Sequence, residues 1–370
     1  MKSFIKLVLF LAIFLLIISG PSDERQKLHN DGPSSCAEIS PVPLPEKEPI
    51  VYTKKEIEYE GAPQVLHILE LDLSNPDLRI IPVLSRDSIF GFELLSEIDK
   101  RCEAAATVNA GFNFAYGQPS GLVIQNGKLL SSSKGYGRIL LLDGQKARFT
   151  PPPFKVWLEA GNNKIPVDSV NPYPYEKGIL VFTREYGPTN RIDTEYTACI
   201  VRNNTVQLTG IVSGELEIPD DGFLITDLNT ENSPLLDLSY GQTVRILLQE
   251  HAEQGYQCSG SIVENGKNVA KDRDEWAGNL NLPTPRTAVG IKDENTLVFL
   301  VVDGRQPGYS IGVTGKQLAD ILISLGVTEA AILDGGASSE MIFNGEIVNR
   351  PSTGKERLIA SAFVIKYNPD

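Results

Sequence analysis

The clearest pattern of hydrophobic and polar positions lies near the C-terminus. Residues 296–302 (TLVFLVV) are apolar without a break, which is typical of a strand covered on both faces. Thr314 and Gln317 then form a capping box, leucine and isoleucine follow at helical spacing, and Gly326 stands where a helix would end. Residues 330–333 form the next apolar stretch. This order of strand, capped helix and strand predicts a βαβ unit, whose two strands must be parallel.

Shorter periodic stretches precede this unit. Alternation over residues 65–73 and an apolar run over 78–84 predict two paired strands. Asn126-Gly127, a strong turn dipeptide, predicts a hairpin within residues 121–142. Two further elements are expected before it: a helix over 92–101 and a strand over 104–108.

These elements predict an α+β or mixed α/β fold, with a mixed sheet, the C-terminal βαβ unit and a strand-rich middle region. We expect one folded domain over residues 50–370, with its core motifs within 104–366. Residues 154–281 contain short strands separated by Gly, Asn and Pro. They form either an insertion or a subdomain.

The N-terminus has the layout of an export signal, because two lysines, Lys2 and Lys6, precede an apolar run over residues 7–18. We expect residues 1–20 to be a signal peptide or an N-terminal membrane anchor and residues 21–49 to be a linker. The protein is then exported and is periplasmic, cell-surface or secreted. The run is shorter than the roughly 20 residues of a membrane span and lacks an A-x-A cleavage site, so cleavage and anchoring through residues 4–18 stay alternatives.

The composition of the chain limits which nucleic-acid and metal partners are compatible with it. With 47 acidic and 34 basic residues the net charge is -13, which argues against a nucleic-acid partner. The three histidines are too few for a histidine-rich zinc site, although Mg²⁺ or Ca²⁺ remains compatible with the sequence. The four cysteines show no CxxC, and both disulfides and free thiols are compatible with their spacing.

Two aspartates mark the candidate site. Asp303 follows the first strand of the βαβ unit and Asp334 follows the second, so both should emerge at the carboxyl edge of one parallel pair, where ligands of open α/β sheets bind. Small residues at 335–339 would let main-chain N–H groups approach an anion or a sugar hydroxyl. The segment Asn109 to Gly111, also after a strand, supplies a third loop.

Three side chains near these aspartates have alternative interpretations. Arg305, two residues beyond Asp303, suits bidentate binding of phosphate or carboxylate, or an ion pair with Asp303 or Asp334, and the two interpretations are not exclusive. Tyr309 would stack on a sugar ring or cover the sheet edge. Glu340 is expected to be an ordinary solvated glutamate on the outer face of the next strand.

Six motifs occur in the order expected of the phosphodiester glycosidase family, which the chain resembles over roughly residues 104–366: ATVNAGFNF, PSGLVIQNGKL, PRTAVGI, VVDGRQPGYSIGVT, ILDGGASSEMIFNG and VNRPS. Many bacterial members are exopolysaccharide-related. The resemblance implies hydrolysis of a sugar-1-phosphodiester, such as one of N-acetylglucosamine, releasing the sugar and a phosphomonoester. It marks these pocket residues: Asn109, Gly111, Ser120, Gly121, Arg286, Asp303, Arg305, Asp334, Gly335, Gly336, Ser338 and Ser339.

This chain departs from the family pattern in one loop. Where members commonly read DGGGSST, it has Ala337 for the third glycine and Glu340 for the threonine. Alanine resists a positive φ, and glutamate brings negative charge to a place where an anionic substrate would pass.

Our hypothesis is cleavage of the sugar C1–O bond on a cell-envelope or extracellular glycan. Asp303 and Asp334 share the carboxylate roles of nucleophile, base or electrostatic partner, Arg305 and Arg286 hold the phosphate, and the loop 335–339 binds sugar hydroxyls. One alternative is a metal-dependent phosphodiesterase that breaks the P–O bond, with the two aspartates as ligands. The other is a non-catalytic, exported glycan-binding module.

Overall fold

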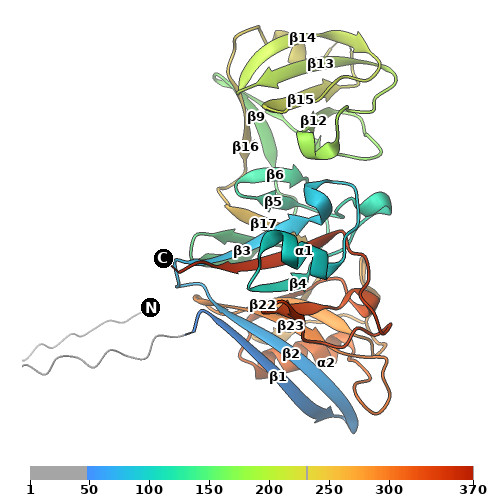
Figure 1. Cartoon of the computed structure of the whole chain (residues 1–370). Helices are drawn as coiled ribbons and strands as arrows, with labels where there is room; N and C mark the ends of the chain where they lie inside the picture. Colours follow the sequence, from blue (N-terminus) through green and yellow to red (C-terminus); the bar gives the residue numbers. More distant parts are fainter. Residues whose placement is uncertain (1–47, 231, 370) are drawn as a thin grey trace, which may run out of the picture. The chain divides into compact units, whose positions relative to one another are not determined.

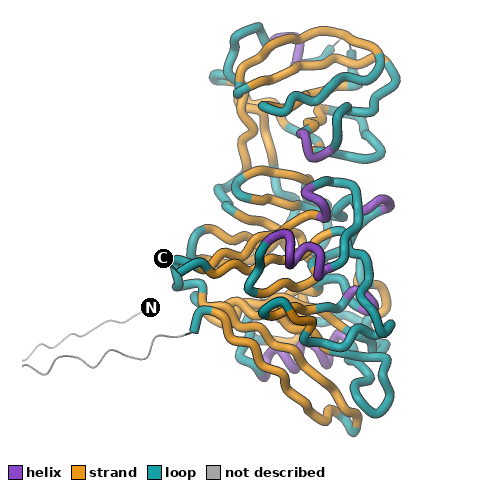
Figure 2. The backbone as a smooth tube through the Cα atoms, viewed as in Figure 1, coloured by secondary structure: helices purple, strands orange, loops and turns teal. Residues whose placement is uncertain are grey.

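The computed structural model describes residues 48–230 and 232–369, and its strands predominate over its helices (Figures 1 and 2). The expected signal or anchor and most of the expected linker fall on residues 1–47, outside the described residues. Within the described part, no helix is both long and apolar enough to cross a membrane.

Two sheets form the body of the molecule. Sheet A has seven strands in the order β1 (Ile50–Tyr59), β2 (Ala62–Asp72), β23 (Thr296–Val302), β22 (Arg286–Asp293), β24 (Glu329–Ile332), β18 (Ser261–Glu264) and β19 (Lys267–Asn268). Sheet B has five strands in the order β26 (Glu346–Ile347), β25 (Met341–Phe343), β4 (Ala106–Asn109), β27 (Ser361–Tyr367) and β3 (Leu78–Leu84).

The other sheets are smaller. Sheet C has the order β6 (Lys128–Ser131), β5 (Val123–Gln125), β17 (Gln254–Cys258), β7 (Arg138–Asp143) and β8 (Lys146–Thr150). Sheet D has the order β11 (Ser169–Val170), β12 (Ile179–Phe182), β15 (Gly222–Asp227), β13 (Glu195–Arg202) and β14 (Thr205–Ser213), and sheet E the order β10 (Asn163–Pro166), β9 (Val156–Ala160) and β16 (Val244–Leu248). A two-stranded ribbon contains β20 (Arg273–Asp274) and β21 (Gly278–Asn279).

The helices are few in the described residues. They are α1 (Leu95–Cys102) and α2 (Gly315–Ser324), with short 3₁₀ turns η1 (Ser85–Asp87), η2 (Ala115–Gly117), η3 (Arg184–Tyr186), η4 (Pro234–Asp237) and η5 (Gly336–Ser338). The predicted capping box of α2 is confirmed, since Thr314 Oγ1 accepts from the Gln317 N–H and the Gln317 side chain accepts from the Thr314 N–H. The predicted hairpin turn is confirmed between β5 and β6, where Asn126 and Gly127 both have positive φ.

The predicted α+β or mixed α/β fold is wrong. The protein is mostly β, and among the strand pairs of the described residues only β11 and β12 are parallel. The predicted βαβ unit fails because β22 lies between β23 and β24 and pairs antiparallel with both. Likewise β2 and β3, expected to pair, lie in different sheets. The patterns located these strands, but strand neighbours are set by contacts distant in the sequence.

The layers follow from the buried faces. One core lies between sheets A and B and also takes side chains from sheet C, including Phe299, Phe363 and Tyr256. A second core lies between the other face of sheet A and α2, and a third between the other face of sheet B and α1. The order α1, sheet B, sheet A, α2 can be followed in Figure 1. Sheet A is therefore covered on both faces, which explains the unbroken apolar run of β23.

The expected strand-rich stretch 154–281 contributes to several sheets. Residues 156–248 form sheets D and E. One core packs these sheets against side chains of sheet C such as Ile124 and Leu141, and a second core is built from sheet D and its loops. From Gln254 onward the chain returns to sheet C through β17 and then to sheet A through β18.

Candidate active site

Sheet A brings the two predicted aspartates to the start of β22. Because β23 and β24 both run antiparallel to β22, they run in the same direction and end at the same edge. Val302 pairs with Arg286, and the Leu333 N–H donates to Thr287 O. Asp303 and Asp334 therefore flank β22 at one edge of sheet A, although the strands before them are not neighbours.

Asn109 joins this edge to sheet B. Its Nδ2 donates to the Asp334 carbonyl at 2.7 Å, and its Oδ1 accepts from Thr287 Oγ1 at 2.9 Å and from the Glu340 N–H at 3.0 Å. The Asp334 N–H donates to Ala110 O at 3.0 Å. The loop after β4 and the loop after β24 are thus held together, so two of the predicted loops meet in the structure.

A small pocket opens between these two loops and has a volume of about 100 Å³. We call it the Asp334 pocket. The predicted residues Asn109, Gly111, Asp334 and Ser338 line it. A methyl group added at Gly111 would lie 2.8 Å from the Tyr256 ring, and the Gly111 N–H donates to Tyr256 Oη at 2.9 Å, so glycine is required there for close packing.

Asp334 is the half-buried carboxylate of this pocket. Burial raises the pKa of its carboxyl, while a hydrogen bond from Ser338, the charge of Arg357 and a hydrogen bond from the Gly335 N–H act in the opposite direction. Arg357 also lines the pocket, and sequence reasoning missed it. It stands in a loop without periodicity or motif (GKERL), so nothing in its surroundings indicated a site.

Two guanidinium groups meet the glycine loop from the side of sheet A. A Cβ on Gly336 would lie 3.2 Å from Arg305 Nη2, and one on Gly335 would lie 3.8 Å from Arg286 Cδ. Burial and then the charge of Arg305 lower the pKa of Arg286 to about 10. Within the described residues neither arginine forms an ion pair, so Arg305 does not pair with Asp303 or Asp334. The charge of Asp274 raises the pKa of Arg286 and so opposes the effects of burial and of Arg305.

The two arginines differ in access. Arg286 is buried, and its Nε and Nη2 donate to the carbonyls of Val313 and Leu282 at 3.2 and 3.1 Å. Arg305 is exposed and has a positive φ of 61°. Arg305 is therefore the guanidinium that can reach an anion, with Arg286 adding positive potential behind it.

The alanine in the glycine loop is accommodated. Gly336 has the positive φ of this loop, at 65°, whereas Ala337 lies in the 3₁₀ turn η5 and has no positive φ. Ala337 therefore causes no backbone strain.

Asp303 lies in a closed hydrogen-bond network, which we call the Asp303 network. Asp303 is 1% exposed. Its Oδ2 is 3.1 Å from His67 Nε2 and accepts from Tyr309 Oη at 3.1 Å, while Oδ1 accepts from Asn349 Nδ2 at 3.1 Å. The Arg350 N–H donates to both oxygens. Both carboxylate oxygens are occupied by donors of the protein itself.

The other predicted residues lie around these centres or away from them. Tyr309 belongs to the Asp303 network, with the Arg350 guanidinium 5.1 Å from its ring centre. Ser339 is buried, and its hydroxyl has no hydrogen-bond partner in the described residues. Ser120 and Gly121 do not line the Asp334 pocket, and a Cβ on Gly121 would meet the Gln257 side chain at 2.5 Å, so this glycine serves packing.

Glu340 contradicts its predicted solvent exposure. It is 1% exposed, and neither carboxyl oxygen has a donor within hydrogen-bonding geometry in the described residues. Burial and then the neighbouring Glu356 raise its pKa to about 8. As predicted, Met341 points to the core between sheets A and B, and Glu340 points to the opposite face of sheet B. That opposite face is covered by α1 and is not open to solvent.

The donor set does not fit a resident cation. No group of three or more His, Cys, Asp or Glu side chains is positioned to hold a metal ion in residues 48–230 and 232–369. Asp303 turns both oxygens to protein donors, whereas Asp334 faces its own pocket.

The same part of the chain contains three free cysteines, Cys102, Cys199 and Cys258.

Comparison with known proteins finds one family whose model matches this chain. Residues 186–366 match the model of the phosphodiester glycosidase family. The chain is also 30% identical over 155 residues to N-acetylglucosamine-1-phosphodiester alpha-N-acetylglucosaminidase of Bos taurus, a match that covers 39% of this chain and 27% of the bovine protein. Just under half of the chain thus matches the phosphodiester glycosidase family. The resemblance in the sequence is confirmed by this match, which supports a glycosidase-type hydrolase.

Two further proteins are similar to this chain, and their names state no activity. The SPbeta prophage-derived uncharacterized protein YomE of Bacillus subtilis (strain 168) is 33% identical over 125 residues, which are 34% of this chain and 19% of that protein. The chain therefore spans only about a fifth to a quarter of the curated relatives it matches. A hypothetical protein from Synechocystis shares the fold, with a TM-score of 0.71, 18% identity and coverage of 86% of this chain and 62% of that one.

Proposed function

We propose that the protein hydrolyses a sugar-1-phosphodiester at the glycosidic C–O bond, and that the sugar is N-acetylglucosamine or a close analogue. The observation that carries the proposal is that Arg305 and Arg286 lie against Gly336 and Gly335, the two residues that follow Asp334. A carboxylate can assist an oxocarbenium-like carbon, and adjacent guanidinium groups can hold a phosphate. The named bovine relative supports this choice of sugar.

In this mechanism Asp334 is the catalytic carboxylate at C1 of the sugar. It acts as nucleophile or as the base that activates water, and the hydroxyl oxygen of that water ends on C1. The bridging oxygen leaves with the phosphate, which Arg305 contacts directly and Arg286 stabilises from behind. Arg357, across the pocket from Asp334, supplies a further positive charge.

Asp303 has a positioning role in this proposal rather than a direct one. Its Oδ1 accepts from Asn349, and the same Asn349 amide donates to Ser339 O at 3.1 Å. Asn349 Oδ1 also accepts from the Met341 N–H at 2.8 Å. Asp303 thereby fixes the far end of the loop that begins at Asp334. We also propose that the reaction takes place outside the cytoplasm, on a cell-envelope or extracellular glycan, as the N-terminal pattern predicts.

The decisive experiment follows the oxygen atom. The purified chain is incubated in H₂¹⁸O with the methyl phosphodiester of N-acetylglucosamine-1-phosphate and, separately, with UDP-N-acetylglucosamine, and Asp334→Asn serves as the control. Label in the free sugar with unlabelled phosphate supports the proposal. Label in the phosphate would mean P–O cleavage, and binding of both compounds without any product would indicate a non-catalytic glycan-binding protein.

A further inference from the structure

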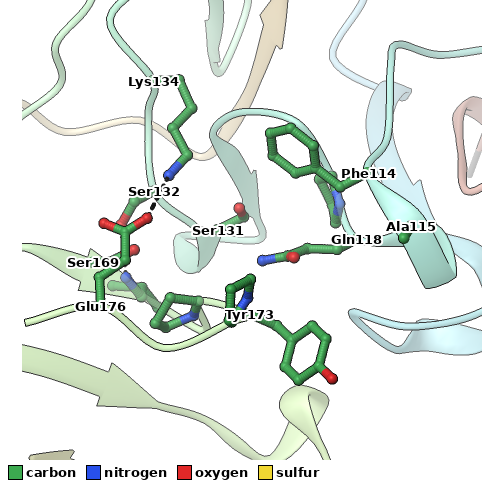
Figure 3. Close-up of a pocket in the computed structure, with 13 residues that line it drawn as sticks. Phe114, Ala115, Gln118, Ser131, Ser132, Lys134, Ser169, Tyr173 and Glu176 are labelled. Carbon is green, nitrogen blue, oxygen red and sulfur yellow. Dashed lines mark hydrogen bonds and ion pairs between the residues drawn. The ribbon is translucent and has the colours of Figure 1, made fainter.

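A second pocket adjoins the Asp334 pocket and differs from it in chemistry. Its volume is about 390 Å³, and we call it the aromatic pocket. Figure 3 shows it between the loop that carries Phe114 and Gln118, the segment that carries Ser131 and Lys134, and the segment that carries Tyr173. By contrast, the Asp334 pocket, at about 100 Å³, is smaller than the roughly 300–1,000 Å³ that enclose a drug-sized ligand. Most of a glycan substrate must therefore lie outside it.

Exposed aromatic side chains gather at the aromatic pocket. Phe114 and Tyr173 line it and are 47% and 40% exposed, and Tyr116, which is 66% exposed, contacts Tyr173 edge to face with the ring centres 6.1 Å apart. Tyr173 also meets Phe90 edge to face at 5.6 Å. In the described residues the other exposed aromatic side chain is Tyr240. Such clustering of apolar surface at a hollow marks a binding site.

The polar side chains that line the pocket carry no net charge: they are Gln118, three serines (Ser131, Ser132 and Ser169), Lys134 and Glu176. Gln118 is 7% exposed, and its Nε2 donates to Asn171 O at 3.3 Å. Its Oε1 has no hydrogen-bond partner in the described residues, and the amide extends into the pocket in Figure 3. Lys134 pairs with Glu176 at 3.8 Å, so the pair brings no net charge. This lining suits a ligand with hydroxyl groups and no charge.

One loop connects the two pockets. Asn109, Gly111 and Asn113 line the Asp334 pocket, and the next residue, Phe114, begins the lining of the aromatic pocket. Asn113 and Phe114 are consecutive, so their Cα atoms are about 3.8 Å apart. The Phe114 N–H donates to Gln118 O at 2.7 Å, which folds the loop back on itself between the pockets. The two pockets are therefore lined by neighbouring residues of one loop.

We propose that the aromatic pocket is a subsite for a neutral pyranose unit of the same glycan whose phosphodiester reacts at Asp334. A pyranose ring has apolar C–H faces, which pack on aromatic rings, and a polar edge of hydroxyl groups, which pair with amides such as that of Gln118. The link to the reaction rests on the proposed function, whereas binding at the pocket does not.

The test measures binding without turnover. The full chain is titrated with neutral trisaccharides (chitotriose, mannotriose and cellotriose) and with trigalacturonate, by calorimetry. At least one neutral trisaccharide is expected to bind, and Phe114→Ala and Tyr173→Ala are each expected to weaken it about three- to tenfold, the effect of losing one aromatic contact. Tyr240→Ala, which removes an aromatic ring that is 81% exposed and does not line the pocket, should leave the affinity unchanged.

Three results would overturn the subsite. They are the absence of binding by every neutral probe, affinity unaltered in both Phe114→Ala and Tyr173→Ala, and tighter binding of trigalacturonate than of any neutral probe. Asp334→Asn separates the two proposals, because it should bind the trisaccharide like the wild type. If the wild type binds the trisaccharide but hydrolyses no phosphodiester, the proposed function is contradicted and the proposed subsite is not.

Discussion

The side-chain amide of Asn109 donates to the main-chain carbonyl of Asp334 at 2.7 Å. Asn109 ends β4 of sheet B, and Asp334 follows β24 of sheet A, so this bond crosses the two layers of the body. The position of the proposed catalytic carboxylate therefore depends on how the sheets pack, and not on its own loop alone.

Asn109→Ala tests this dependence. The change leaves the Glu340 N–H and the Asp334 carbonyl without their partner in a buried place, and we expect a loss of about 2–4 kcal/mol in the free energy of unfolding. Urea unfolding measures it. Thr287→Val, which removes only the bond to Asn109 Oδ1, should cost about 1 kcal/mol. Equal costs for the two variants would contradict the bridging role.

Asp303→Asn separates positioning from direct catalysis. The amide cannot accept at both atoms from Tyr309, Asn349 and the Arg350 N–H, so we expect about 3–5 kcal/mol of lost stability together with reduced turnover. Asp334→Asn, by contrast, should lose most of kcat with little change in unfolding. A stable Asp303→Asn protein with thousandfold lower kcat would show instead that Asp303 takes part in the reaction directly.

Arg305→Ala should weaken phosphate recognition. Because Arg305 is exposed and has no ion pair in the described residues, its removal should raise KM for the phosphodiester and the inhibition constant of inorganic phosphate by about tenfold, with little effect on stability. Steady-state kinetics gives both numbers. Arg245→Ala, at an exposed arginine of β16, is the matched control and should change neither. An unaltered inhibition constant in Arg305→Ala would place the phosphate elsewhere.

Glu340 should make stability depend on pH. Its pKa is about 8 in the folded protein against 4.5 in the unfolded chain, so its contribution to stability is full below pH 4.5 and is lost as pH rises through 8. Glu340→Gln does not titrate there, and its advantage over the wild type in unfolding free energy should grow from pH 5 to pH 8. Glu346→Gln, at an exposed glutamate of β26, should show no such trend. A constant difference across this range would contradict the raised pKa.

Features of this fold that depend on neighbouring residues could be predicted from the sequence, whereas the pairing of strands distant in the sequence could not. The capping box at Thr314 and the turn at Asn126-Gly127 are set by neighbouring residues, and both predictions were correct. The insertion of β22 between β23 and β24 is set by pairing over many residues, and no periodicity encodes it. The resulting edge still gathers both aspartates, because the two strands keep a common direction.

Some residues of the candidate site could likewise be predicted from the sequence, and others could not. The glycine loop after Asp334 was visible as an interruption of an apolar run, whereas Arg357 lies in an irregular loop. His67 stands at a polar position of an alternating strand, which predicts exposure to solvent. It is fully buried because sheet A is covered on both faces, and it contacts Asp303 there.

Residues 151–253 leave sheet C after β8 and return to it at β17, and only β7 lies between those two strands. Two strand spacings are about 10 Å, which a few residues can bridge. The segment therefore lies between two strands of sheet C that are close in space, and its side chains also pack on one face of that sheet. Since Ser169 and Tyr173 of the aromatic pocket belong to it, changes in this segment would alter the proposed pyranose subsite without changing any residue that lines the Asp334 pocket.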